Sequence, residues 1–108
     1  MNEQAYTLAM YRVKANQEND FISAWNKLAD TFTALPNPPL WGTLIRHQTD
    51  RTLFYSFGPW QSAEHVKAMR ESAEAQNAFR KLHEFCVELI PGDFEIVTHV
   101  DVQSGART

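Results

Sequence analysis

More than any other segment, residues 53–64 constrain the fold of this chain, with the sequence LFYSFGPWQSAE. Bulky apolar side chains occupy successive positions before the Gly58-Pro59 break, and alternate residues of a strand point to opposite faces of its sheet. Both faces of this strand must therefore be covered. One layer of helices covers only one face, so we expect a second copy of the chain to cover the other.

Composition limits the chain to a single folding unit. It has 108 residues, of which 44% are hydrophobic and 21% charged, a size typical of one domain. We assign residues 3–103 to this domain and residues 104–108 to a flexible tail. The formal net charge is -3 and no basic stripe is present, which argues against a nucleic-acid partner.

The same composition predicts a cytoplasmic protein without a membrane partner. Cys86 is the single cysteine, so no intrachain disulfide can form. The first residues lack the basic and apolar regions of a signal peptide, and no apolar run approaches the ~20 residues that span a bilayer.

The first third of the chain predicts a strand followed by an amphipathic helix. Residues 6–14 suit a strand, and Asn16 or Asn19 is the expected helix cap after it. The helix carries apolar side chains at steps of four and three: Phe21, Trp25, Leu28, Phe32 and Leu35. This stripe predicts packing on a sheet, and the prolines of residues 36–39 end the helix.

The rest of the chain predicts a hairpin, a helical region and a last strand. Residues 40–48 and 52–57 should pair as antiparallel strands around a polar loop. Ser62 should cap a short helix, and residues 71–90 should form a helix with a kink or break near Ser72, its stripe being Phe79, Leu82, Cys86 and Leu89. Pro91-Gly92 should end it before a final edge strand at residues 94–102. This order is the split βαβ pattern of α+β ferredoxin-like folds.

With this strand order, the segment Trp60-Gln61-Ser62-Ala63-Glu64 resembles the antibiotic biosynthesis monooxygenase family of dimeric α+β barrels. The resemblance extends over about residues 6–102. It implies a homodimer in which two sheets pair face to face, with a small-molecule cavity between each sheet and its own helices. It also implies a cofactor-independent monooxygenase, an oxidoreductase whose small aromatic or quinone-like substrate supplies the electrons. No cofactor is then expected.

Such chemistry needs an apolar pocket with few polar groups. Trp60 offers a flat surface and one N–H donor, while Tyr11 or Tyr55 can donate a hydrogen bond to a developing oxyanion. The resemblance adds Met69 and Phe79, which fall at places where family members carry functional residues. We therefore predict Trp60, Tyr55, Met69 and Phe79 as substrate-binding residues and Tyr11 as a catalytic residue. For each aromatic side chain the alternative is plain core packing.

His83 and His65 are the remaining catalytic candidates, because a neutral imidazole can act as a base near neutral pH. The position of His83 next to Leu82 in the packing stripe suggests partial burial and favours it, whereas the alternative for His65, between Glu64 and Lys67, is simple solvation. On one helix, His83 and Cys86 would share a face, as a metal pair or an activated thiol would require. We favour a structural Cys86 that acts as a small buried hydrophobe, and no metal site is predicted.

Other functions stay open on the same scaffold. The cavity could belong to a non-catalytic small-ligand-binding or stress-response module, which the lack of a base near Met69 favours. The family's haem-degrading branch has an Asn, a Trp and an iron-ligating His at places that fall near Tyr11, Met69 and Phe79. None of these residues matches, so haem binding or degradation is disfavoured unless His83 supplies the ligand.

Overall fold

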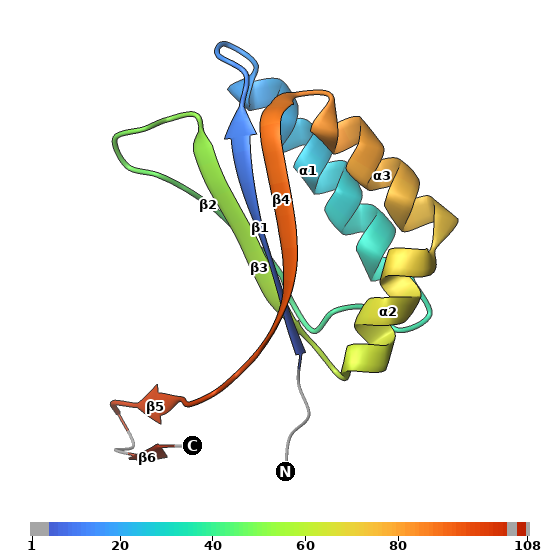
Figure 1. Ribbon diagram of the computed structural model, residues 1–108, viewed down its shortest axis with the longest axis vertical. Helices are drawn as coiled ribbons and strands as arrows, with labels where there is room; N and C mark the ends of the chain where they lie inside the picture. Colours follow the sequence, from blue (N-terminus) through green and yellow to red (C-terminus); the bar gives the residue numbers. More distant parts are fainter. Residues whose placement is uncertain (1–4, 104–105, 108) are drawn as a thin grey trace.

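The computed structural model describes residues 5–103 and 106–107. Its main body consists of β1 (Ala5–Val13), α1 (Glu18–Thr33), β2 (Thr43–Arg46), β3 (Leu53–Trp60), α2 (Ala63–Glu71), α3 (Ala73–His83) and β4 (Cys86–Glu95). The strands form one antiparallel sheet in the order β2-β3-β1-β4. All of the helices lie on one face of this sheet (Figure 1). The ferredoxin-like α+β fold expected from the sequence is therefore confirmed.

The core lies where α1 and α3 cover the central strands. Tyr11 of β1 and Phe54 of β3 both contact Phe21 of α1, with ring centroids 5.0 and 4.8 Å away. Leu28 and Leu82 extend this cluster from the two helices and are 5% and 0% exposed. The predicted stripe of α1 thus packs on the sheet, as its spacing required.

The expected cap of α1 is wrong. The helix begins after Gln17, whose side chain makes no capping hydrogen bond. Asn16 instead adopts a left-handed backbone with φ 68°, a conformation that asparagine tolerates better than most residues. The predicted Ser62 cap is confirmed, because its hydroxyl oxygen accepts from the backbone N–H of His65. Ser72 caps the next helix in the same way, by accepting from the backbone N–H of Ala75. Ser72 also breaks the helical region into α2 and α3, as predicted.

The predicted helix over residues 71–90 is wrong beyond His83. Residues 86–95 form edge strand β4, and Pro91 and Gly92 lie inside it rather than ending a helix. A β-bulge explains the error: Val13 pairs with Cys86 and the preceding Arg12 pairs with Glu88, which leaves Val87 as the extra residue. Because of the bulge, Cys86 and Leu89 face the same side of the sheet, although they are three residues apart. A spacing of three residues is also that of one helix face.

The chain beyond β4 also differs from the expected strand over residues 94–102. It leaves the sheet and forms β5 (Val100–Asp101), which pairs with β6 (Ala106–Arg107) away from the main body (Figure 1). Within the predicted tail of residues 104–108, positions 104, 105 and 108 lie outside the described residues. Across the described part of the chain, no helix combines the length and apolarity needed to cross a membrane.

Strand β3 runs through the Gly58-Pro59 step instead of breaking there, and ends at Trp60. Residues 40–42 precede the short strand β2 and lie against this extension, where the backbone N–H of Leu40 donates to the carbonyl oxygen of Pro59 at 2.9 Å. A Cβ at position 58 would collide with the backbone carbonyl oxygen of Trp41. Glycine is therefore required for this close approach.

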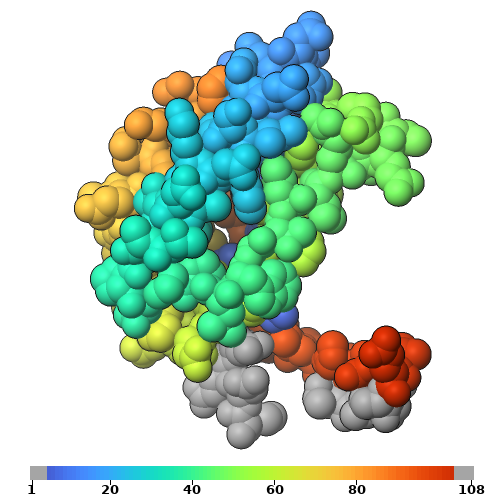
Figure 2. Space-filling view, turned by 180° about the vertical axis from the view of Figure 1, so that it is seen from behind, coloured from blue at the N-terminus to red at the C-terminus, as the bar shows by residue number. Residues whose placement is uncertain are grey.

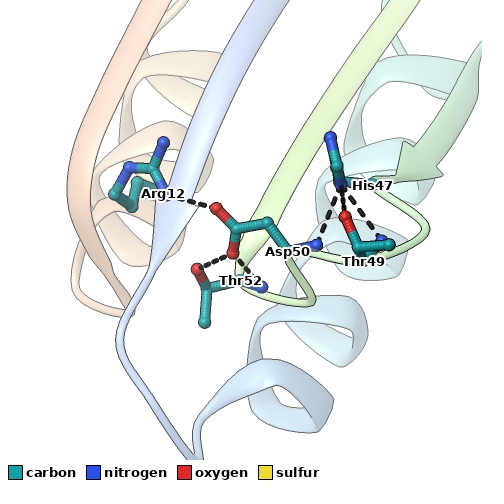
Figure 3. A network of polar contacts seen from close by, with 5 residues as sticks. All are labelled: Arg12, His47, Thr49, Asp50 and Thr52. Carbon is teal, nitrogen blue, oxygen red and sulfur yellow. Dashed lines mark hydrogen bonds and ion pairs between the residues drawn. The ribbon is translucent and has the colours of Figure 1, made fainter.

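Side chains organise the turn between β2 and β3 (Figure 3). The Asp50 carboxylate accepts from Thr52 Oγ1 at 2.8 Å and from Arg12 Nη1 at 3.0 Å. His47 Nδ1 accepts from the backbone N–H groups of Asp50 and Thr49 at 2.9 and 3.1 Å. The network ties this turn to β1 and fixes the register of the hairpin.

The sheet face opposite the helices is apolar and open. The side chains of Leu8, Ile45, Tyr55, Ile90 and Phe94 are 36% to 53% exposed on it. Alternate positions of the same strands are buried under the helices, so the doubly apolar pattern of the sequence corresponds to one covered and one exposed face.

Candidate functional site

A cavity of about 280 Å³ lies between the strands β1 and β3 and the helix α1. Residues 39–42, which follow α1 in the chain, form another side of it. Figure 2 shows a hollow between α1 and this green segment, with dark blue atoms of β1 at its floor. Most of the lining is apolar, and aromatic side chains come from strands, helices and the segment at residues 39–42. This arrangement suits a flat apolar ligand.

Trp60, at the end of β3, forms one wall of the cavity and is 1% exposed. Its ring meets that of Phe32 edge to face at 5.8 Å, and Phe32 meets Phe79 in the same manner at 5.7 Å. The Trp60 Nε1–H donates to Thr7 Oγ1 at 3.0 Å. The indole therefore has its hydrogen bond within the protein and presents mainly its apolar surface to the cavity.

Tyr11 places a phenolic hydroxyl at the cavity wall. Its oxygen lies 2.7 Å from Ser56 Oγ, and the side chain is 1% exposed. Burial raises the pKa of Tyr11, and the Ser56 hydroxyl together with the nearby Trp25 side chain offsets part of that rise. Tyr11 is therefore protonated at neutral pH, as a hydrogen-bond donor rather than a base.

Trp25 of α1 is a lining residue that the sequence did not predict. Its side chain lies close enough to Tyr11 to affect the phenol pKa, yet Nε1 is buried and has no hydrogen-bond partner among the described residues. An unpaired buried donor costs about 1–3 kcal/mol. The sequence showed Trp25 only as part of the packing stripe, and no local signal distinguished it from the other apolar members.

Arg70 supplies the charge at the cavity wall and was not predicted either. Its guanidinium pairs with the Asp93 carboxylate at 2.5 Å and lies 5.9 Å from the centre of the Phe79 ring. The charge is thus balanced within the protein. Apart from Arg70 and Tyr11, no titratable side chain of the described residues lines the cavity.

The structure brings together four of the predicted site residues: Tyr11, Trp60, Met69 and Phe79 all line the cavity. Tyr55 does not, because it lies on the open face of the sheet and is 37% exposed. Met69 and Phe79 are apolar wall residues that α2 and α3 direct toward the sheet.

Neither predicted base lines this cavity. His83 is the exposed last residue of α3 and borders a separate open pocket. His65 lies in the first turn of α2, and its Nδ1 is buried with no hydrogen-bond partner in the described chain. The shared helix face of His83 and Cys86 is also wrong, because Cys86 begins β4.

Cys86 is buried, as expected, although in a strand rather than a helix. It is 6% exposed, and burial raises the pKa of its thiol to about 11. Its Sγ lies 3.5 Å from the carbonyl oxygen of Leu82, to which the thiol donates. Within residues 5–103 and 106–107, no three His, Cys, Asp or Glu side chains come together as metal ligands.

Comparison with solved structures matches this fold over most of the chain. SnoaB, a cofactor-independent oxygenase from Streptomyces nogalater, superposes in a mutant form with a TM-score of 0.80 at 14% identity, over 88% of this chain and 94% of that one. A Nitrosomonas europaea protein, provisionally named an antibiotic biosynthesis monooxygenase, superposes with a TM-score of 0.75 at 13% identity, over 90% of this chain and 93% of that one. A Bacteroides thetaiotaomicron protein described as a possible oxidoreductase superposes with a TM-score of 0.76 at 20% identity, over 89% of this chain and 100% of that one.

No family model matches the chain, and no curated protein matches its sequence. The solved structures therefore establish a shared fold with proteins named as antibiotic biosynthesis monooxygenases. At these identities the fold alone carries over, and the chemistry must be argued from the cavity.

Proposed function

We propose that this chain is a cytoplasmic, cofactor-independent monooxygenase that acts on a small aromatic or quinone-like molecule in the cavity beside Trp60. The observation that supports this most is the aromatic wall of Trp60, Phe32 and Phe79 around a space of about 280 Å³. The fold shared with SnoaB, a cofactor-independent oxygenase, is consistent with it.

The substrate supplies both the proton and the electrons in this proposal. A ring CH₂ beside a carbonyl ionises to an enolate, and O₂ oxidises that carbon by four electrons. The CH₂ becomes a carbonyl, one oxygen atom enters the product, and the other leaves as water with the two hydrogens. Tyr11, protonated and buried, donates a hydrogen bond to the enolate oxygen as charge develops there.

Because no His, Asp, Glu or Lys of the described chain lines the cavity, the substrate must ionise without a strong protein base. Ring systems with an acidic CH₂, such as anthrone, meet this condition. The protein then contributes orientation, a hydrogen-bond donor and exclusion of water.

The direct test is oxygen uptake with anthrone under air. We expect uptake above the spontaneous rate, with one atom of labelled O₂ in the product. Tyr11→Phe should lower kcat by about 10²- to 10³-fold if the phenol is the main donor to the oxyanion. Ser56→Ala is the matched control, since it removes the hydroxyl beside Tyr11 and leaves the phenol. Equal rates for wild type and Tyr11→Phe would contradict the assignment of Tyr11.

The lack of a strong base in the cavity favours a second candidate, a non-catalytic ligand-binding or stress-response module. It predicts that aromatic molecules bind without oxygen uptake above the spontaneous rate. Binding by calorimetry and uptake by an oxygen electrode, on the same protein and ligand, separate the two functions.

We also propose that the open sheet face forms a homodimer interface. Leu8, Ile90 and Phe94 are exposed there, and a standard interface buries about 1,600 Å² in total. Light scattering should give twice the 12.4 kDa mass of the chain, and Ile90→Glu should shift the protein to a monomer. A 12.4 kDa particle at micromolar concentration would reject the dimer.

A further inference from the structure

We infer that the open groove between α3 and β4 binds the carboxylate of a ligand whose rings occupy the cavity, so that the ligands of this chain are aromatic carboxylic acids with a short side arm. The inference rests on the proposed use of the cavity for aromatic ligands and not on the oxygen chemistry. It assigns to Arg80 and His83 a role in specificity.

One face of α3 supplies the polar side of this groove. Gln76, Arg80 and His83 follow one another at steps of four and three, so they lie on the same side of the helix. Leu89 and Pro91 of edge strand β4 form the apolar side, on the sheet face that the helices cover. The groove has a volume of about 360 Å³. It therefore joins an apolar surface to a row of polar and cationic side chains.

No protein carboxylate balances the charge of Arg80. Among the described residues, no Asp or Glu side chain lines the groove, and the ion pairs of the described chain do not include Arg80. Its Nη1 donates to the neutral side-chain oxygen of Asn77 at 3.0 Å, which leaves other N–H groups of the guanidinium for a ligand. Arg70 differs, because Asp93 already neutralises it. The free cation of the groove is thus Arg80, and His83 beside it adds an imidazole donor.

The groove and the cavity are neighbours that share one wall. Met69, Arg70, Phe79 and Pro91 line both of them. The ring of Phe79 belongs to the aromatic wall of the cavity, and the next residue along α3 is Arg80. A side arm that leaves the rings of the ligand beside Phe79 therefore enters the groove next to the guanidinium.

Size and charge define the ligand class. The cavity, at about 280 Å³, is nearly twice the roughly 150 Å³ that accommodates benzene in an engineered apolar cavity, so one or two fused rings fit it. A planar carboxylate matches the fork of N–H groups on a guanidinium, whereas a neutral arm leaves the charge without a partner. The cavity and the groove together should therefore prefer an aromatic acid to the amide of the same shape.

The test compares 3-(1-naphthyl)propionate with its amide by calorimetry, because the two probes share their rings and arm and differ in charge. The measured quantity is the ratio of their affinities, and wild type should prefer the acid. Arg80→Gln should lower this preference about 2- to 5-fold, the range of an exposed ion pair. The double variant Arg80→Gln, His83→Gln should lower it further.

Lys81→Gln is the matched control. It removes the same charge from the next residue of α3, which lies on another face of the helix and does not line the groove. The ratio should therefore stay unchanged in Lys81→Gln. Because the whole chain has a net charge of -3, a preference that came from the overall field of the protein would instead fall equally in both single variants.

Two measurements on wild type locate the parts of the acid. It should displace 1-naphthol, a two-ring probe without an arm, because the rings of both occupy the cavity. In a ¹⁵N NMR spectrum of the arginine side chains, the acid should shift the Arg80 Nε–H resonance more than the amide does. Trp60→Phe should weaken acid and amide together and leave their ratio unchanged, since Trp60 contacts the rings alone.

Several results would each overturn the inference. These are an unchanged affinity ratio in folded Arg80→Gln, an equal fall of the ratio in Lys81→Gln, binding of the acid without displacement of 1-naphthol, and no binding of either probe. Oxygen uptake plays no part in these outcomes, so a failed oxygenase assay leaves them intact.

Discussion

Truncation of Trp60 should reduce both stability and ligand binding, and the two losses can be separated. Trp60 is 1% exposed and its indole bonds Thr7. Trp60→Ala removes a buried aromatic side chain, which costs about 3–5 kcal/mol of the free energy of unfolding. A domain of this size has a total of about 5–15 kcal/mol, so the variant should still fold at 25 °C.

The loss of binding has a smaller expected size. Ring-on-ring contact contributes about 0.5–1.5 kcal/mol beyond area burial, so folded Trp60→Ala should bind 1-naphthol about 2- to 13-fold more weakly from this cause alone. Urea unfolding followed by circular dichroism gives the stability, and calorimetry on the folded protein gives the affinity. Thr7→Val is the control that removes the hydrogen-bond acceptor and keeps the indole. It should cost about 1–2 kcal/mol of stability and little affinity.

The assignment of Trp60 to the ligand site fails if folded Trp60→Ala binds 1-naphthol as tightly as wild type. Trp60 would then be a core residue alone. An unfolded Trp60→Ala at 25 °C would instead place the total stability of the protein at the low end of about 5–15 kcal/mol, and Trp60→Phe would then carry the binding comparison.

Three further predictions concern the scaffold. Burial raises the pKa of Cys86 to about 11, so a thiol reagent at about pH 8 should label native protein far more slowly than urea-unfolded chain; equal rates would contradict this. Hydrogen bonds from Thr52 lower the pKa of Asp50 below its ordinary value of 3.8. The stabilisation they give is therefore present above pH 3.8 and is lost as the pH falls through the lowered pKa. Asp50→Asn should make the urea midpoint depend less on pH between about pH 5 and pH 2, and an equal pH dependence in variant and wild type would rule this out. Gly58→Ala should displace the backbone of Trp41, cost about 1–3 kcal/mol of stability and weaken the binding of an aromatic ligand. Gly42→Ala is the control and should leave stability and binding unchanged, because nothing lies within 4 Å of the added Cβ.

Local chemistry explains which parts of the fold the sequence predicted. Ser62 and Ser72 cap helices because a hydroxyl oxygen accepts from a backbone N–H three residues later, and this requires no distant contact. The packing face of α1 is also predicted correctly, because the spacing of apolar residues along one helix is a local property. The predictions of Asn16 as a helix cap and of Gly58-Pro59 as a strand end are wrong. Asparagine is common in turns as well as at caps, and a Gly-Pro pair can continue a strand as well as end it, so the local sequence does not choose between the two conformations.

The sequence predicts helix for the first half of β4, because the bulge there is a property of strand pairing and not of β4 alone. Val87 becomes the extra residue only when β4 aligns with Arg12 and Val13 of β1. From the sequence, Cys86 and Leu89 have the spacing of one helix face. Because Cys86 begins β4, it does not share a helix face with His83, and the geometry behind the disfavoured metal-pair alternative does not exist.

The two indoles of the cavity show why site residues are harder to predict than folds. Helical spacing correctly directs Trp25 toward the sheet, and strand parity correctly places Trp60 on the same side. Whether either N–H finds a protein acceptor depends on the position of one hydroxyl across the sheet. Thr7 accepts from Trp60, and no described residue accepts from Trp25. That difference arises only when β1, β3 and α1 are assembled, so the sequence of any one element cannot show it.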